Sequence, residues 1–173
     1  MIFLLGLMWI SLGVYSLYII LFITGLYRLK NTSKRNHLSD YPNVSVVIAA
    51  RNESKNLGSL LEDLASQDYP KNKLEIIVTD DRSIDNTWEI ITDFINEYLN
   101  FKGIQIANKS NEMTPKKHAL SEAISSARGS IILSTDGDCR VSTTWVSSMV
   151  AKLECNIGIV TGFSSVELSL IHI

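Results

Sequence analysis

Two carboxylates stand close together in the stretch "IILSTDGDC" (131–139). Asp136 and Asp138 are separated only by Gly137, and like charges at that spacing repel unless a positive charge lies between them. In an extended segment residues i and i+2 point the same way, so both carboxylates can face one ligand, and glycine lets that ligand approach the backbone. Two such oxygen ligands, completed by water and substrate phosphates, suit Mg²⁺ or Mn²⁺. The alternative is a plain polar turn, because Asp-Gly is a frequent turn dipeptide.

Other polar residues follow apolar runs in the same way. Asp80 and Asp81 end "LEIIVTDD" (74–81), where neighbouring side chains point to opposite sides, so we expect one to face a ligand and the other the loop. An aspartate there can accept hydrogen bonds from a ribose hydroxyl or a base imide, or it can cap a helix. Glu53 can contact the same nucleoside, or act as a favourable first-turn acid. Lys116 opens a helix, where a cation is otherwise unfavourable, and can reach a diphosphate.

Alternating strands and helices must position these residues. Short apolar, β-branched runs predict strands over 44–50, 74–81, 103–107, 130–135 and 157–162. Segments with helical spacing of apolar residues lie between them, and Ser54, Asp85 and Gly129 are expected to cap those helices. This alternation predicts an α/β fold with a mainly parallel sheet, whose ligands bind outside the carboxyl ends of the strands. The polar clusters should therefore converge on one rim.

A hydrophobic segment precedes this domain. Residues 1–27 carry no charged side chain, and about 20 apolar residues suffice to cross a bilayer, so we expect a transmembrane helix. A signal peptide fits less well, because the apolar stretch is too long and lacks a basic start. Residues 28–43 are polar and basic and are predicted to form a juxtamembrane linker. By the positive-inside rule they place the rest of the chain in the cytoplasm, as a single-pass protein of the cell membrane.

Composition and missing motifs exclude several function classes. A net charge of −2 argues against a nucleic-acid partner. Cys139 and Cys155 suit a reduced compartment and have no zinc-type spacing. The chain contains no glycine-rich phosphate loop and no G-x-S-x-G element. A diphosphate held by a metal and carboxylates is therefore a better prediction than one held by backbone amides.

The ordered motifs resemble those of a known family. "VSVVIAARNESKNLGSLLEDLASQDYPKNKLEIIVTDDRSIDNT", "PKKHAL" and "ILSTDGDC" resemble family 2 glycosyltransferases of the GT-A fold, over about residues 44–162. The resemblance implies a nucleotide-diphospho-sugar donor, often a uridine one, a glycan or lipid-linked acceptor, and inversion at the anomeric carbon. It implies donor-binding roles for Ala49, Arg51, Glu53, Asp80, Asp81, Lys116 and Asp136. Asp136 and Asp138 match the D-x-D element, whose Mg²⁺ or Mn²⁺ bridges the diphosphate.

The resemblance also bears on the general base. The general base of such enzymes lies well downstream of the D-x-D element, and "CNIGIVTGFSSVELSLIHI" contains no E-D pair and no Q-x-x-R-W element. We therefore expect residues 44–173 to be a C-terminally incomplete donor-binding domain, with the base beyond Ile173. A non-catalytic sugar-nucleotide-binding module is the first alternative. A nucleotidyltransferase ranks last, because "AARNESKN" lacks a glycine-rich basic loop.

Overall fold

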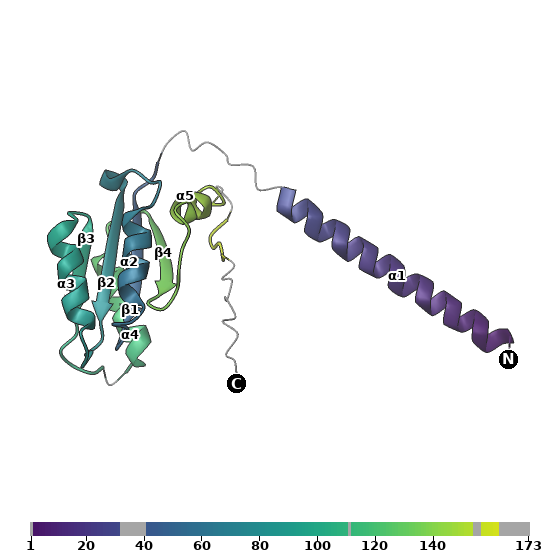
Figure 1. Ribbon diagram of the computed structural model, residues 1–173, viewed down its shortest axis with the longest axis horizontal. Helices are drawn as coiled ribbons and strands as arrows, with labels where there is room; N and C mark the ends of the chain where they lie inside the picture. Colours follow the sequence, from purple (N-terminus) through teal and green to yellow (C-terminus); the bar gives the residue numbers. More distant parts are fainter. Residues whose placement is uncertain (1, 32–40, 111, 154–156, 163–173) are drawn as a thin grey trace. The chain divides into compact units, whose positions relative to one another are not determined.

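A computed structural model describes residues 2–31, 41–110, 112–153 and 157–162 (Figure 1). The chain divides into two units, Met1–Asn36 and His37–Ile173, and each is described by itself. The first unit holds helix α1, and the second holds an α/β layer structure with the polar clusters identified in the sequence.

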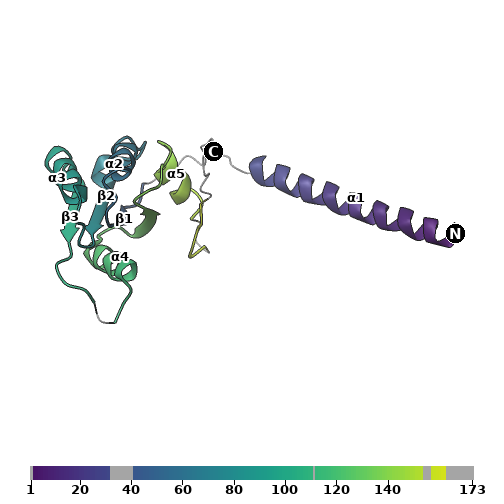
Figure 2. The ribbon, with the colours of Figure 1, turned by 60° about the horizontal axis from the view of Figure 1, so that its bottom comes forward.

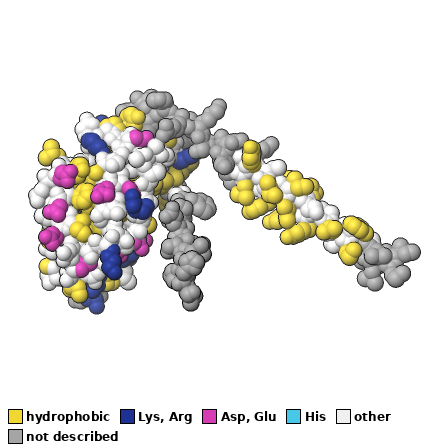
Figure 3. Space-filling model, viewed as in Figure 1, with side chains coloured by type: hydrophobic (Ala, Val, Ile, Leu, Met, Phe, Trp, Pro, Cys, Tyr) yellow, Lys and Arg dark blue, Asp and Glu magenta, His cyan; other side chains and the backbone are white. Residues whose placement is uncertain are grey.

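Helix α1 runs from Ile2 to Asn31 without interruption. Its segment Met8–Tyr27 has a mean hydropathy of 1.9, and by length and composition it can cross a membrane. Figure 3 shows hydrophobic side chains along this helix, whereas acidic and basic side chains are interspersed on the second unit. The helix continues past the predicted end at Tyr27, because arginine, leucine and lysine are good helix formers and no proline or glycine follows before Asn31.

The second unit is built on a four-stranded sheet in the order β3-β2-β1-β4, with every pairing parallel. The strands are β1 (Val44–Ala50), β2 (Leu74–Asp80), β3 (Phe101–Gln105) and β4 (Ile131–Asp136). The arrows of β2 and β4 point the same way in Figure 1. The predicted α/β fold with a parallel sheet is therefore confirmed, and all four strands end at one edge of the sheet.

Helices cover both faces of the sheet, as Figure 2 shows for α2 and α3 on one side and α4 on the other. The helices are α2 (Leu57–Ala65), α3 (Thr87–Glu97), α4 (Pro115–Ser126) and α5 (Trp145–Val150), with a short 3₁₀ helix η1 (Lys71–Lys73) before β2. Alternate residues of β1 face opposite layers: Val46 and Ile48 join the core under α2, α3 and α5, while Val47 packs with Ala123 of α4. Because both faces of the sheet are buried, the sequences of β1 and β2 are nearly continuous runs of apolar residues.

The predicted strand over residues 157–162 is wrong, because these described residues form no strand. Val160, Thr161 and Gly162 instead lie beside β4 and α5, lining a hollow with Trp145 and Met149. An apolar run becomes a strand only when a neighbouring strand accepts and donates its backbone hydrogen bonds, and no such partner is paired with this segment in the described part of the chain.

The expected caps are also corrected. Helix α2 begins at Leu57 with Asn56 at its N-cap, not Ser54, because the Glu53 carbonyl accepts the amides of Asn56 and Leu57 and closes a turn first. Helix α4 ends with Ala127 at its C-cap. Gly129 is needed for another reason: a Cβ on it would lie 2.4 Å from the backbone nitrogen of Ser45.

Candidate functional site

The carboxyl ends of β1, β2 and β4 meet at one edge of the sheet. Ala50 pairs with Asp80 and Ala49 with Asp136, so the polar residues that end β2 and β4 flank the end of β1. A cavity of about 270 Å³ opens there, lined by Ala49, Ala50, Arg51, Glu53, Asp81, Pro115, Lys116, Ala119, Asp136, Gly137 and Asp138. Every site residue predicted from the sequence lines this cavity except Asp80.

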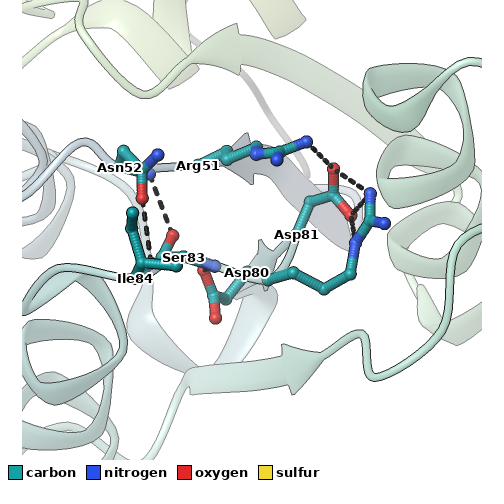
Figure 4. Close-up of polar contacts among 7 residues, drawn as sticks. Arg51, Asn52, Asp80, Asp81, Ser83 and Ile84 are labelled. Atoms are coloured by element: carbon teal, nitrogen blue, oxygen red, sulfur yellow. Dashed lines mark hydrogen bonds and ion pairs between the residues drawn. The ribbon is translucent and has the colours of Figure 1, made fainter.

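Asp81 is the buried acid of the cavity, with 4% of its side chain exposed. Nε of Arg82 donates to its Oδ1 at 2.8 Å and Nη2 donates to its Oδ2 at 3.1 Å, while Nη1 of Arg51 lies 3.5 Å from Oδ2 (Figure 4). The hydrogen bonds from Arg82 lower the pKa of Asp81 below its usual value, against the opposing effect of burial, and the charge of Arg51 adds to this. The carboxylate is therefore ionised at neutral pH and presents hydrogen-bond acceptors to the cavity.

Asp80 points away from Asp81, as alternation along a strand requires (Figure 4). Its Oδ1 accepts the backbone N–H of Ser83 at 3.2 Å, and Nε2 of Gln105 lies 3.5 Å from its Oδ2. The side chain is fully buried outside the cavity lining. In this structure Asp80 holds the loop after β2, and its predicted contact with a donor stays a prediction.

The sequence interpretation missed the residues that join the loops after β1 and β2. Asn52 and Arg82 adopt left-handed backbone conformations, with φ of 56° and 57°. The N–H of Asn52 donates to Oγ of Ser83 at 2.9 Å, and Oδ1 of Asn52 accepts the N–H of Ile84 at 2.9 Å (Figure 4). Asparagine tolerates this conformation, so an asparagine just after a buried strand was the available signal. Such strained positions concentrate at functional sites.

Asp85 links the same two loops. Its carboxylate accepts the N–H of Ser54 at 3.2 Å and the N–H of Thr87 at 3.1 Å, and the hydroxyl of Thr87 also donates to it. The bonds from Thr87 and Ser54 lower its pKa. Asp85 thus bonds the start of α3 as expected of a cap, although Asn86 occupies the N-cap position. The hydroxyl of Thr87 in turn accepts the N–H of Glu53 at 2.9 Å, which fixes that residue at the cavity.

A positive charge does lie beside the D-x-D carboxylates, and it is Lys116. Its Nζ lies 2.7 Å from Oδ1 of Asp136, with both side chains more than half exposed. The hydrogen bond to Asp136, supported by the charges of Asp136 and Asp138, raises the pKa of Lys116. Helix α4 carries this lysine from the opposite layer to the end of β4, a pairing that no local sequence pattern specifies.

The D-x-D segment is a turn rather than the extended segment expected. The N–H of Cys139 donates to the carbonyl of Asp136 at 3.2 Å, which places Gly137 and Asp138 in the bend. Gly137 is buried against Glu53, whose Cγ lies 3.4 Å from the position of a Cβ. Asp136 and Asp138 nevertheless both line the cavity. The predicted extended conformation of residues 136–138 is therefore wrong, although both carboxylates lie at one site.

The residues present fit a divalent cation that a substrate helps to bind. Within the described ranges no group of three or more His, Cys, Asp or Glu side chains is placed to hold a metal ion. Asp136 and Asp138 offer two carboxylates at an open cavity. Mg²⁺ is commonly bound in this manner, by one or two carboxylates together with water and substrate phosphates, rather than by an all-protein cage.

The segment after the D-x-D turn is fixed to α2. The guanidinium of Arg140 donates to both carboxylate oxygens of Asp63, at 2.6 and 2.8 Å, and the N–H of Val141 donates to Asp63 at 3.1 Å. Gln67, which is buried, donates to the carbonyl of Ser142 at 2.7 Å and accepts the N–H of Val146 at 2.9 Å. Asp63 on α2 and Gln67 just after its end therefore hold the chain that leaves the site.

Replacing Asp63 by Asn is expected to lower the free energy of unfolding at pH 7 by about 1 kcal/mol, because Arg140 is largely exposed and solvent screens the pair. The bonds from Arg140 lower the pKa of Asp63 in the folded state, so its contribution is fully present above the unfolded pKa. The difference between wild type and Asp63→Asn should shrink as the pH falls below about 4. Urea unfolding across pH measures it, and a pH-independent difference would contradict the assignment.

Comparison with known proteins agrees with this geometry. The family model described as Glycosyl transferase family 2 matches residues 45–166. The probable glycosyltransferase YdaM of Bacillus subtilis is 32% identical over 140 residues, which cover 78% of this chain and 32% of that protein.

Two solved structures are similar as well. Staphylococcus aureus TarS 1–349 in complex with UDP-GlcNAc has a TM-score of 0.55 at 30% identity, covering 63% of this chain and 30% of that one. The mannosyltransferase PcManGT from Pyrobaculum calidifontis, in complex with GDP-Man and Mn²⁺, has a TM-score of 0.57 at 25% identity, covering 65% and 32%. The chain thus spans about a third of the length of these relatives. With its parallel sheet, its D-x-D turn and a family match over most of its length, the chain belongs to glycosyl transferase family 2 and has the GT-A fold.

Proposed function

We propose that the protein transfers a sugar from a nucleotide-diphospho-sugar, a uridine one, to a saccharide or lipid-linked acceptor, with inversion, and that residues 44–173 bind the donor. The observation that carries this proposal is the cavity at the ends of β1, β2 and β4, where acids and bases from four separate segments converge. The UDP-GlcNAc and GDP-Man complexes of the two similar structures support a nucleotide-sugar ligand for this chain.

Asp81 and Glu53 form the nucleoside end of the proposed site. The ionised carboxylate of Asp81 is held by Arg82 and Arg51 at the buried side of the cavity, where it can accept a hydrogen bond from a base imide or a ribose hydroxyl. Glu53 lies between this end and Gly137 of the D-x-D turn. The hydrogen bonds through Asn52, Ser83 and Thr87 fix both acids before a ligand arrives, which reduces the entropy lost on binding.

Lys116, Asp136 and Asp138 form the diphosphate end. A divalent cation, Mg²⁺ or Mn²⁺, held by the two aspartates would stabilise the negative charge that builds on the leaving nucleoside diphosphate. The Mn²⁺ complex of the mannosyltransferase supports a divalent cation here. Lys116 is already paired with Asp136 at 2.7 Å, so its ammonium is within reach of a phosphate bound beside that carboxylate.

In the proposed reaction, an acceptor hydroxyl oxygen bonds to the anomeric carbon from the face opposite the leaving group. The bond from that carbon to the diphosphate oxygen breaks, and the nucleoside diphosphate leaves with the electron pair. The acceptor hydroxyl gives its proton to a general base, which we expect downstream of the D-x-D turn. The residues described at the cavity bind and orient the donor and stabilise its diphosphate. Ala49, Lys116 and Asp136 lie on β1, α4 and β4. The hydrogen bonds between the loops after β1 and β2 fix Glu53 and Asp81, so the cavity can hold the anomeric carbon in one orientation.

We propose further that residues 1–27 span the cell membrane once, that 28–43 form a basic linker, and that the donor-binding domain lies on the cytoplasmic side. The apolar segment Met8–Tyr27 supports the span, and the basic residues that follow it in the sequence support the side. Retention of the chain in membranes washed with alkaline carbonate tests the span. Protease digestion of sealed inside-out vesicles tests the side, and protection of the domain there would contradict it.

The donor proposal is tested by calorimetric titration of the full chain in mild detergent with UDP, GDP and uridine, with and without Mn²⁺. UDP is expected to bind in the presence of Mn²⁺ and at least about tenfold more weakly without it, because the diphosphate would then face the carboxylates of Asp136 and Asp138 with only the single charge of Lys116 to offset them. Uridine should show little dependence on Mn²⁺, since it carries no phosphate. A folded chain, verified by circular dichroism, that binds none of these ligands would contradict the proposal.

A further inference from the structure

A second hollow lies at the opposite edge of the sheet, where the strands begin. This groove, of about 480 Å³, is bounded by the segments that precede all four strands: Asn43 before β1, η1 before β2, Leu99 and Asn100 before β3, and Arg128 and Gly129 before β4. Strand β1, with seven residues, separates it from the donor cavity, and a strand of that length spans about 23 Å. The groove therefore belongs to a different surface of the domain.

The groove carries an excess of positive charge. Lys71, Lys73, Lys102 and Arg128 line it, with Glu75 as the one acid among its lining residues. The Glu75 carboxylate is already occupied, because it accepts the hydroxyl of Ser45 and the backbone N–H groups of Arg128 and Gly129. The donor cavity has the opposite balance, with four acids against Arg51 and Lys116. An anionic surface would therefore attract the groove edge of the domain and repel the cavity edge.

Leu99 adds an apolar group to this cationic edge. Its side chain is fully exposed although it lines the same groove as the basic residues. A leucine that projects among lysine and arginine side chains matches a lipid interface, where the apolar group enters the acyl boundary and the cations meet the headgroup phosphates. A nucleic acid would use the charges but would leave Leu99 in water. The combination therefore favours a membrane surface over nucleic acid.

The connection along the chain limits how far this edge can lie from an anchored helix. The chain enters β1 at the groove, where the carbonyl of Asn43 accepts the N–H of Ile131 and the hydroxyl of Ser130, both at 3.2 Å. Ten residue steps join Asn31, the last residue of α1, to Tyr41, and a fully extended chain of that length spans at most about 36 Å. A helix anchored in the bilayer would therefore keep the groove edge within reach of the lipid surface.

We propose that this groove binds the headgroups of anionic phospholipids, with Leu99 inserted at the interface, so that the donor cavity faces away from the membrane. The proposal rests on the proposed membrane anchoring by residues 1–27. Each lysine or arginine near an anionic leaflet contributes about a fivefold factor to such an equilibrium, so four of them suffice to orient a tethered domain. A water-soluble nucleotide would then reach its cavity directly from solution.

The test uses the full chain reconstituted in phosphatidylcholine vesicles with and without about one-third phosphatidylglycerol. Both variants carry Cys139→Ser and Cys155→Ser, so that a fluorophore attaches at one cysteine only. The label is placed at Leu99→Cys or, as the matched control, at Ile84→Cys. Ile84 is 92% exposed and lies in the loop at the other edge of the sheet. Lipids with a nitroxide just below the headgroup should quench the label at residue 99 several-fold more than that at residue 84. The difference should require phosphatidylglycerol and should decline as salt rises from about 0.05 to about 0.5 M.

A charge variant completes the test. Replacing Lys71 and Lys102 by Gln should lower the equilibrium constant for docking about 30-fold and remove the selective quenching at residue 99. Equal quenching at both positions, or quenching that survives these substitutions, would overturn the proposal. The proposal would also be overturned if lipid quenching were absent and the chain instead bound a single-stranded oligonucleotide, with that binding abolished by the same substitutions. UDP titration of each sample reports the donor site separately, and carbonate extraction reports the anchor, so failure of either is distinguished from failure of the groove.

Discussion

Replacing Asp138 by Ala is expected to weaken Mn²⁺-dependent binding of UDP by about two orders of magnitude, while binding of uridine changes little. Asp138 lies in the D-x-D turn at the mouth of the cavity and provides one of the two carboxylates proposed to hold the cation. Loss of even an indirect supporting group of a metal site commonly lowers affinity 10- to 100-fold, so loss of a direct ligand should reach the upper end. Calorimetric titration with UDP at fixed Mn²⁺ measures the effect.

Asp138 is a sharper choice than Asp136 for this experiment. Asp136 also pairs with Lys116 at 2.7 Å, so its removal would change the position of the lysine as well as the proposed cation site. Asp93→Ala, which removes an exposed acid from α3, is the matched control for the change in net charge and should bind UDP like the wild type. If Asp138→Ala and Asp93→Ala bind UDP equally well in Mn²⁺, the D-x-D turn holds no cation and the diphosphate half of the proposed site is wrong.

Replacing Gly129 by Ala is expected to lower the free energy of unfolding by about 2–3 kcal/mol, because the added methyl group has no space. A Cβ at this position would lie 2.4 Å from the nitrogen of Ser45 and 2.7 Å from the carbonyl carbon of Val44, both backbone atoms that cannot rotate aside. The N–H of Gly129 also donates to Oγ of Ser45 at 2.7 Å. The displacement would therefore disturb the start of both β1 and β4.

Gly58→Ala provides the matched control for this substitution. A Cβ at Gly58, inside α2, would meet Cγ2 of Ile90 at an ordinary 3.9 Å, and alanine is the better helix former. The free energy of unfolding should therefore rise by up to about 1 kcal/mol. Urea unfolding of the full chain in mild detergent, followed by circular dichroism, measures both variants. An unchanged midpoint for Gly129→Ala would show that the loop before β4 shifts at no cost and that the close approach is not required.

Much of the fold follows from local sequence, and the reasons are physical. Continuous apolar β-branched runs specify strands buried on both faces, and helical spacing of leucines, as in α2, specifies the helices between them. Because parallel strands end at one edge of the sheet, the acids at the ends of β1, β2 and β4 must lie along that same edge. Residues 157–162 mark the limit of this reasoning, since an apolar run without a hydrogen-bonding neighbour does not become a strand.

The sequence by itself therefore determined the class of fold, the apolar N-terminal helix and most of the polar side chains that meet at the cavity. The tertiary structure decided which of two adjacent acids enters that cavity, Asp81 rather than Asp80, and that Lys116 of α4 reaches Asp136 of β4. It also decided that Asn52 joins the two loops and that a basic groove forms where the strands begin. These features depend on strand order and on contacts between residues distant in the chain, whereas propensity and periodicity act over a few neighbouring residues.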